Sequence, residues 1–198
     1  MRAPGRRRQR GQSLAEFTLI LPIILAMAFS VAEFGVAYGT NMTLIEATRE
    51  GARVGAVLAN GSNSLGCPGA TGAASVDPQV ILAVERAIES PGSGITLAKI
   101  DWVDIYKSNA SGGEALVNRW TPAPGGGPTI CGVKLDFVQG TVNWPAASRS
   151  STLPADSLGV LIQYHYTLFT PLSVVTGLFG AQNITMVDTT VMDLEPSA

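Results

Sequence analysis

The stretch LAEFTLILPIILAMAFSVAEFGVAY, residues 14–38, decides how the rest of the chain is arranged. Residues 17–32 carry no charge, and as a helix the whole stretch would be roughly 37 Å long, against roughly 30 Å for the hydrocarbon core of a bilayer. Pro22 inside it removes one backbone hydrogen bond, which a membrane helix tolerates. The stretch predicts one tilted membrane span.

The charges around this span predict its orientation. Eight basic and fifteen acidic residues follow the first ten positions, a formal charge of about −7 that argues against nucleic-acid binding. No basic cluster follows the span. We therefore expect a single-pass cell-membrane protein with a cytoplasmic N-terminus and an extracytoplasmic C-terminal domain. Five of the thirteen basic residues precede the span with no acidic residue among them: Arg2, Arg6, Arg7, Arg8 and Arg10.

A cleaved secretory signal peptide is the alternative for this segment, because it has a basic start and an apolar middle. No clear A-x-A site ends the apolar run, since AFSVAEF matches it poorly. The residues that follow, NMTLIEATREGARVGAVLA, are good helix formers without proline, so the helix is predicted to continue from about residue 13 to 59.

Glu16 stands at the entrance of the span, where an ordinary anchor has no use for a carboxylate. If the chain is cut after Gly11, Gln12 becomes the N-terminus, Glu16 the fifth residue and Phe17 the sixth. This pattern of basic leader, glycine, four residues, glutamate, aromatic residue and apolar helix resembles that of type IV prepilins.

The resemblance narrows to the TadE-like family of the tight-adherence pilus system, over about residues 10–56. Phe17 stands where major Flp pilins have tyrosine, and the chain is far longer than such a pilin, which favours the TadE branch. The matching features are R-G-Q at 10–12, E-F at 16–17, Pro22, E-F-G at 33–35 and A-x-R-E-G-A-R at 47–53.

This resemblance implies a minor pilin, or pseudopilin, needed for assembly of a Flp-type IV pilus. A prepilin peptidase would cut it after Gly11. Its further partners would be other Tad/Flp pilins and minor pilins, the inner-membrane assembly platform and the membrane, and it would remain in the membrane or enter the pilus. The family also implies a strand-rich extracytoplasmic domain of variable sequence.

Cleavage would give Glu16 a partner, because it frees an α-amine at Gln12 about one helical turn away. An ammonium–carboxylate pair relieves the cost of taking both charges out of water. The pair forms within one chain or, by analogy with pilins, with a neighbouring subunit, where it sets axial register. The alternative is that Glu16 reaches the cytoplasmic headgroups. Glu33 is predicted to be an interfacial residue or a second intramembrane contact to a partner helix.

The chain is expected to have three parts: a leader at 1–11, a membrane and stalk helix at 12–59, and an extracytoplasmic α+β domain at 60–198. In the outer part of the helix, charged residues lie mainly opposite an apolar face, spaced for mutual salt bridges (Glu46, Arg49, Glu50 and Arg53). The spacings Gly35-x-x-x-Gly39 and Gly51-x-x-x-Gly55 allow close helix approach. The apolar face consists of Leu44, Ala47, Gly51, Val54 and Leu58.

The C-terminal domain reads as a turn-rich linker at 60–75, a second helix at 77–89 with Asp77 as N-cap, and then strands. The run VLIQYHYTLF is typical of a central strand, and residues 171–179 read as a short helix. An antiparallel sheet backed by the two helices is the simplest packing. The expected strands are 95–106, 115–120, 134–144, 157–169 and 183–194.

Cys67 and Cys131 are the only two cysteines, and outside the cytoplasm such a pair predicts a disulfide. Closing a loop of about 64 residues would contribute about 4 kcal/mol in the entropy model. A metal site of both cysteines and His165 lacks a fourth ligand and the usual spacings. A Cys–His hydrolase lacks a signature, so His165 is expected to be a core or edge residue.

Two functions from different classes remain. The first is the structural minor pilin. The second is a membrane-anchored extracytoplasmic binding module whose anchor is not cut. No phosphate-binding loop, carboxylate pair or dinucleotide fingerprint is present, so we expect neither an enzyme nor a bound cofactor.

The substitution Glu16→Ala tests the pairing role. It should leave cleavage after Gly11 largely intact and weaken pilus assembly, because the new ammonium at Gln12 loses its carboxylate partner. The two readouts are the mass of the mature N-terminus and the amount of sheared pilus. Normal piliation in this variant would contradict the pairing role.

Overall fold

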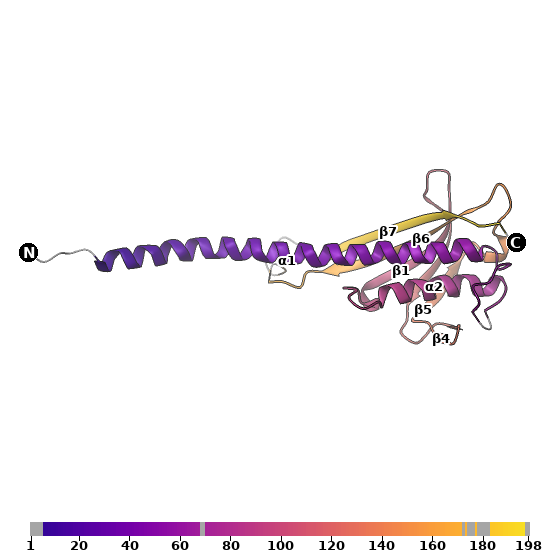
Figure 1. Cartoon of the computed structure of the whole chain (residues 1–198), viewed down its shortest axis with the longest axis horizontal. Coiled ribbons are helices and arrows are strands. Elements are labelled where there is room, and N and C mark those ends of the chain that lie inside the picture. The colour runs from indigo at the N-terminus through magenta and orange to yellow at the C-terminus, as the bar shows by residue number, and fades with distance from the viewer. Residues whose placement is uncertain (1–5, 68–69, 172, 174–176, 178–182, 197–198) are drawn as a thin grey trace, which may run out of the picture. The chain divides into compact units, whose positions relative to one another are not determined.

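A computed structural model describes residues 6–196 of the chain, apart from 68–69, 172, 174–176 and 178–182. α1 (Arg6–Leu58) is one continuous helix that passes through Pro22 (Figure 1). The helix expected over residues 13–59 is confirmed, and it begins earlier, within the arginine-rich leader.

The chain forms two compact units, and α1 contributes to both. The N-terminal unit consists of Met1–Ala37 and Thr167–Asn183, and the body unit of Tyr38–Tyr166 and Ile184–Ala198. The outer part of α1 therefore belongs to the same unit as the sheet.

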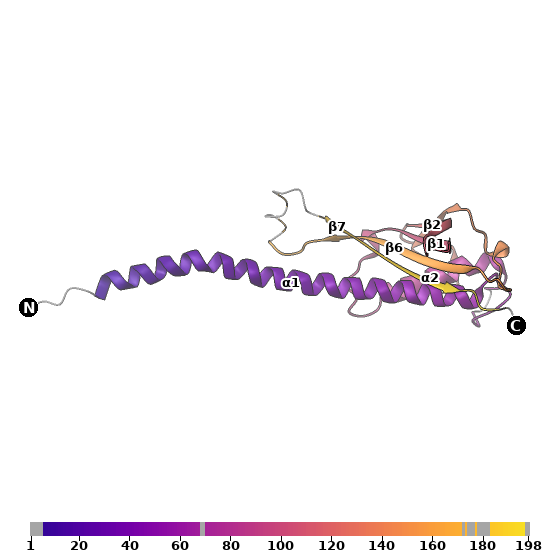
Figure 2. The same cartoon turned by 90° about the horizontal axis from the view of Figure 1, so that it is seen from above.

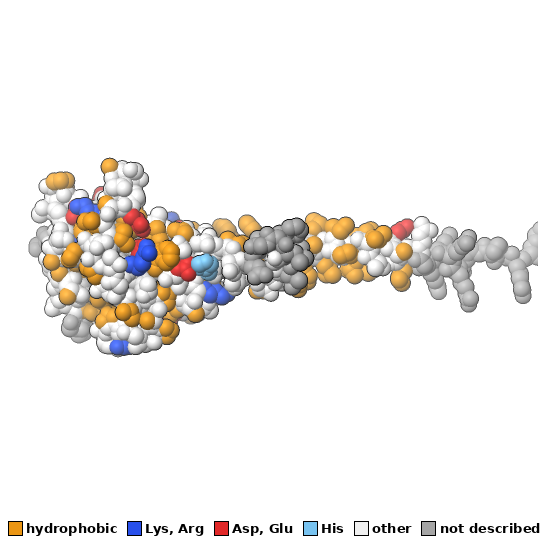
Figure 3. Space-filling model, turned by 180° about the vertical axis from the view of Figure 1, so that it is seen from behind, with side chains coloured by type: hydrophobic (Ala, Val, Ile, Leu, Met, Phe, Trp, Pro, Cys, Tyr) orange, Lys and Arg blue, Asp and Glu red, His pale blue; other side chains and the backbone are white. Residues whose placement is uncertain are grey.

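In the N-terminal unit, α1 exposes apolar side chains all around its axis. Residues 12–28 are all exposed, and hydrophobic side chains dominate the surface of this part of the helix (Figure 3). Soluble proteins rarely expose a continuous apolar surface of this extent. Among the described residues, α1 is the one helix long and apolar enough to span a membrane, as predicted for a single-pass membrane protein.

The body unit contains a five-stranded sheet in the order β5-β2-β1-β6-β7. The pairs β1–β2, β1–β6 and β2–β5 are antiparallel, and in this register Val103 lies opposite both Trp120 and Ile162. β6, predicted to be central, is an inner strand beside β1. The strands are β1 (Ile100–Ser108), β2 (Glu114–Pro122), β5 (Phe137–Val142), β6 (Ser157–Thr167) and β7 (Asn183–Asp193).

Both helices pack on the same side of this sheet, as Figure 2 shows for α1 and α2 (Val76–Ile88). The contact is close because α1 presents glycines there: a Cβ on Gly51 would lie 2.7 Å from Val84 Cγ2, and one on Gly55 would lie 2.8 Å from Leu158 Cδ2. The predicted spacing Gly51-x-x-x-Gly55 thus serves packing inside the body unit, whereas the spacing Gly35-x-x-x-Gly39 makes no such close contact in this chain. The predicted apolar face is buried throughout: Leu44, Ala47, Gly51, Val54 and Leu58.

Two predicted strands differ from the observed ones by more than two residues at one end. Residues 97–99 form a 3₁₀ turn, so β1 begins at Ile100 rather than at residue 95. The strand expected over 134–144 is split, because its start belongs to a hairpin of β3 (Thr129–Ile130) and β4 (Val133–Lys134). The prediction of a helix at 171–179 falls largely outside the described residues.

A disulfide joins Cys67 and Cys131, as predicted, with a Cα–Cα distance of 5.3 Å. Cys131 and Gly132 form the turn of the β3–β4 hairpin and both have positive φ, the signature of a two-residue hairpin turn. The bond therefore ties the loop that follows α1 to the tip of this hairpin.

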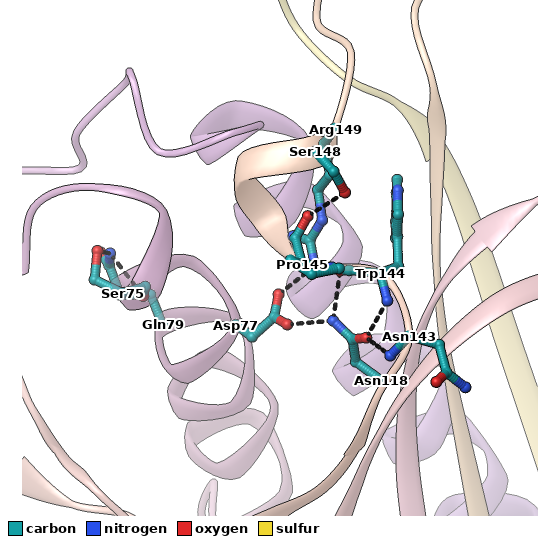
Figure 4. Close-up of polar contacts among 9 residues, drawn as sticks. All are labelled: Ser75, Asp77, Gln79, Asn118, Asn143, Trp144, Pro145, Ser148 and Arg149. Carbon is teal, nitrogen blue, oxygen red and sulfur yellow. Dashed lines mark hydrogen bonds and ion pairs between the residues drawn. The ribbon is translucent and has the colours of Figure 1, made fainter.

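Asp77 is not the N-cap of α2, which is Ser75. Asp77 is buried in the first turn, where its carboxylate accepts hydrogen bonds from Asn118 Nδ2 (2.7 Å) and Arg149 Nη2 (2.6 Å) (Figure 4). Asn118 in turn accepts from the backbone N–H of Trp144 at 2.8 Å and donates to its carbonyl at 2.7 Å. The Asp77 carboxylate therefore binds residues of β2 and of the loop after β5, and it does not cap α2 as predicted.

The substitution Gly51→Ala should destabilise the body unit by about 1–3 kcal/mol, because the added methyl overlaps Val84 in a packed core. The matched control is Gly39→Ala on the same helix, where the new Cβ would meet no atom within 4 Å other than those of the neighbouring helix backbone. It should be neutral or stabilise by up to about 1 kcal/mol. Denaturant unfolding in detergent, followed by the fluorescence of buried Trp120 and Trp144, measures both. Equal effects of the two substitutions would contradict the close packing.

Candidate functional site

The predicted cleavage and pairing residues lie together at the start of the span. Gly11 and Gln12 are inside α1, and Gln12 Nε2 donates a hydrogen bond to Glu16 Oε1 at 3.1 Å. Glu16 and Phe17 are both exposed. The Glu16 carboxylate thus has the Gln12 side chain as its neighbour, one helical turn toward the N-terminus.

The bond between Gly11 and Gln12 is helical in this structure, so a peptidase that needs the bond in an open conformation must first unwind this turn. Apart from proline, glycine is the residue that lowers helix stability most, by about 1 kcal/mol relative to alanine. Gly11 is therefore a favourable point for the helix to open.

Glu33 is only 5% exposed, and its carboxylate binds the chain's own backbone. Its two oxygens accept hydrogen bonds from the N–H groups of Phe169 (3.2 Å) and Thr170 (3.1 Å). Both amides follow the end of β6 at Thr167, beyond the sheet ladder, and so need acceptors elsewhere. Glu33 was predicted to be an interfacial residue or a contact to a partner helix, and in this structure its carboxylate contacts the backbone of its own chain.

Sequence reasoning identified Glu33 but not this partner. An acid near the end of a span signals a partner, because an unpaired carboxylate is costly there. Nothing local points to residues that follow Glu33 by 136 and 137 positions. The absence of charge in the connection after β6 is the one sequence feature that relates it to the span.

The body unit has an open groove of about 680 Å³ between α1, α2 and the disulfide. Glu50 and Arg53 form a salt bridge on its wall at 2.6 Å, and this hydrogen bond lowers the pKa of the Glu50 carboxyl. Its remaining charged lining residues are Glu46, Arg49 and Arg86. The groove thus carries fixed charges over an apolar floor, and no serine, histidine or free thiol is among its lining residues.

The residues considered for metal binding or hydrolysis are engaged elsewhere. Cys67 and Cys131 are bonded to each other, and His165 Nδ1 lies 2.7 Å from the Asp101 carboxylate. Among the described residues, no group of three or more His, Cys, Asp and Glu is placed to hold a metal ion.

His165 was expected to be a core or edge residue, and in the structure it is neither. It points to the sheet face opposite the helices, because β6 alternates and buries its neighbours Tyr164 and Tyr166. Its side chain is 41% exposed on an inner strand.

Glu85 on α2 is the acid with the most strongly altered ionisation among those outside the span. Burial raises the pKa of its carboxyl to about 7. One carboxylate oxygen accepts the backbone N–H of Asp136 at 2.7 Å, so Glu85 holds the loop that leads into β5. This geometry makes Glu85 a structural acid.

The fold defines a class of protein, in which an N-terminal helix able to span a membrane continues into the core of an α+β domain. Within this class, residues 11–53 match the model of the family described as TadE-like protein. The match confirms the resemblance over this segment and points to a protein associated with the Tad pilus. It covers most of α1 and no strand of the sheet. No curated protein and no solved structure gave a match.

The raised pKa of Glu85 predicts a pH dependence of folding. Its contribution is fully present below its ordinary pKa of 4.5 and is lost as the pH rises through about 7, because the unfolded state ionises this carboxyl more readily. The substitution Glu85→Gln keeps an acceptor for the Asp136 N–H and removes the charge. The stability of the wild type relative to this variant should therefore fall between pH 4.5 and pH 7, as measured by denaturant unfolding. A constant difference across that range would contradict this assignment.

Proposed function

We propose that this chain is a TadE-like minor pilin, or pseudopilin, that is needed for assembly of a tight-adherence, Flp-type IV pilus. The observation that carries the proposal is the family match over residues 11–53. It begins at Gly11, the glycine that precedes the proposed cut, and includes both Glu16 and Glu33.

Processing would proceed at the cytoplasmic end of α1, where the arginines hold the leader on the inner side of the membrane. A prepilin peptidase cuts after Gly11 and removes the basic leader. The product carries an α-ammonium on Gln12, at the end of a helix where Glu16 already lies one turn away.

The charge change at this end is the physical reason for assembly. The uncut chain brings five arginines to the membrane surface, which oppose withdrawal of the helix into an apolar bundle. After the cut, one ammonium remains, and the Glu16 carboxylate of the same or a neighbouring subunit neutralises it. The apolar surface of residues 12–28 then packs against other pilin helices, and the electrostatic pair sets the axial register.

The body unit would act as a structural module, not as an enzyme, at the tip or base of the pilus. Its core includes the outer part of α1, and its disulfide fixes the loop that leaves that helix. Its partners would be other pilins and minor pilins together with the inner-membrane assembly platform.

The decisive experiment is the mass of the mature N-terminus in cells with and without the prepilin peptidase. Wild-type protein should begin at Gln12 when the peptidase is present and should keep its arginine-rich leader when the peptidase is absent. The substitution Gly11→Ala should accumulate protein with its leader intact, because the peptidase requires glycine at this position.

Ser13→Ala, two residues from the cut, is a matched control and should be processed normally. Wild-type protein that keeps its leader in cells with active peptidase would contradict the proposal. It would favour the alternative, a membrane-anchored binding module whose anchor is not cut.

A further inference from the structure

The two edges of the five-stranded sheet differ in how well they are protected from other strands. An edge strand exposes N–H and C=O groups that can pair with another chain, and proteins usually shorten or distort such edges. β5 follows this rule, because it has six residues and its pairing with β2 shifts register between Asn118 and Trp120. β7, at the other edge, has eleven residues (Figure 1). The β5 edge is therefore a poor template for a further strand, whereas β7 is long enough for one.

The sequence of β7, NITMVDTTVMD, also lacks the residues that usually protect an edge. It contains no proline, glycine or lysine, and its threonines, valines and isoleucine favour strands. Apolar side chains are exposed along it, since Ile184, Val187 and Val191 are 47%, 51% and 38% exposed. β7 thus has the composition of a paired strand although it stands at an edge.

The backbone of β7 has hydrogen-bonding groups to offer. Every second residue of an edge strand directs its N–H and C=O away from the sheet. Within the described part of the chain, these groups at residues 184–193 make no hydrogen bond to another element. Such bonds begin only after the strand, where Leu194 N–H donates to the Asp156 carbonyl and Glu195 N–H donates to the Ala56 carbonyl. An extended segment placed along β7 would supply the missing partners.

This edge is held in position from both faces of the sheet. On the helix face, Thr48 Oγ1 of α1 donates to the Asp188 carboxylate and lies 3.0 Å from Thr190 Oγ1. On the opposite face, Thr189 Oγ1 lies 2.7 Å from the Tyr106 hydroxyl. A strand fixed in this way is preorganised, so a partner does not have to order it on binding.

The charges of β7 indicate what its partner carries. Asp188 and Asp193 are the only charged residues of the strand. Both accept hydrogen bonds from neutral hydroxyls, Asp188 from Thr48 and Asp193 from Ser157 at 2.6 Å. A neutral donor leaves the negative charge of a carboxylate uncompensated, so a basic residue on the opposite strand favours pairing.

A second copy of this chain does not fit the edge. α1 and β7 run in the same direction, because Thr48 contacts Asp188 and Ala56 contacts Glu195 further along both elements. Two β7 strands paired antiparallel would therefore point their α1 helices in opposite directions, which two spans in one membrane cannot do. Pairing with β5 of another copy would leave much of β7 uncovered, since β5 has only six residues.

We propose that β7 is a docking edge for an extended segment of a second protein, with apolar side chains at alternate positions and a basic residue opposite the carboxylates. The segment pairs with residues 184–193 and extends the five-stranded sheet by one strand. Its apolar side chains cover Val187 and Val191. The inference concerns the body unit alone and goes beyond the proposed function.

The test measures the binding of a synthetic peptide to the full-length chain in lipid nanodiscs. The peptide has the sequence of residues 184–193, which alternates as the partner should, with lysine in place of both aspartates and a fluorescein label. Fluorescence anisotropy should show saturable binding above that of empty nanodiscs. The matched peptide that keeps both aspartates should bind about fivefold more weakly, because like charges then meet along the edge.

Methylation of alternate peptide amides separates backbone pairing from side-chain contact. N-methyl groups at positions 186, 188 and 190 remove the donors along one edge of the peptide, and those at 187, 189 and 191 remove them along the other. One set should abolish binding and the other should preserve it, because only one edge of the peptide faces β7.

A pair of substitutions in the protein locates the binding edge. Val187→Lys should weaken binding about tenfold, because a lysine on an edge strand opposes pairing. Val142→Lys, the matched control on β5, should bind the peptide as the wild type does. Both valines are exposed, so neither substitution should unfold the body unit.

Four results would each overturn the proposal. They are the absence of saturable binding, equal binding of the lysine and aspartate peptides, equal binding of the two methylated peptides, and equal effects of Val187→Lys and Val142→Lys. The experiment requires neither cleavage after Gly11 nor a pilus. Its failure would therefore leave the proposed function standing, and failure of cleavage would leave this inference standing.

Discussion

The structure depends on the close approach of α1 to α2 and β6, which the glycines at 51 and 55 make possible. At Gly51 a single added methyl would overlap Val84, and at Gly55 it would overlap Leu158. The helix that is able to span a membrane is therefore also a core element of the α+β unit, with Leu44, Ala47 and Leu58 fully buried. A domain built in this way cannot separate from this helix without losing part of its core.

The same helix carries two carboxylates near the ends of its span, and each is accommodated differently. Glu16 is exposed at the N-terminal end of the span, where the Gln12 amide is its neighbour and where we propose that cleavage supplies a full positive charge. Glu33 is buried by its own chain and is satisfied by two backbone amides. Glu16 is exposed and would be available to the ammonium that the proposed cleavage creates, whereas the Glu33 carboxylate already binds the backbone of Phe169 and Thr170.

Periodic and compositional signals predicted most of the fold, and contacts distant in sequence account for what they missed. The apolar repeat of residues 44–58 and the strand β6 could be predicted because each is a local pattern. The disulfide could be predicted, although its cysteines are 64 residues apart, because Cys67 and Cys131 are the only two cysteines. The prediction that Asp77 is the N-cap of α2 was wrong, because its carboxylate accepts hydrogen bonds from Asn118 and Arg149, which belong to other elements. Likewise the partners of Glu33 lie more than 130 residues away along the chain. They are backbone N–H groups, which almost every residue has, so the sequence does not identify them.

The central claim is that the outer part of α1 is part of the folded body unit and not a free stalk, and amide hydrogen exchange of the full chain in lipid nanodiscs tests it most directly. Amides at residues 44–58 should exchange as slowly as those of β1 and β6, and low denaturant should accelerate all three together, because they open only with global unfolding. Exchange at 44–58 that is much faster than in β1 and β6, at a denaturant concentration where the sheet stays protected, would contradict the account.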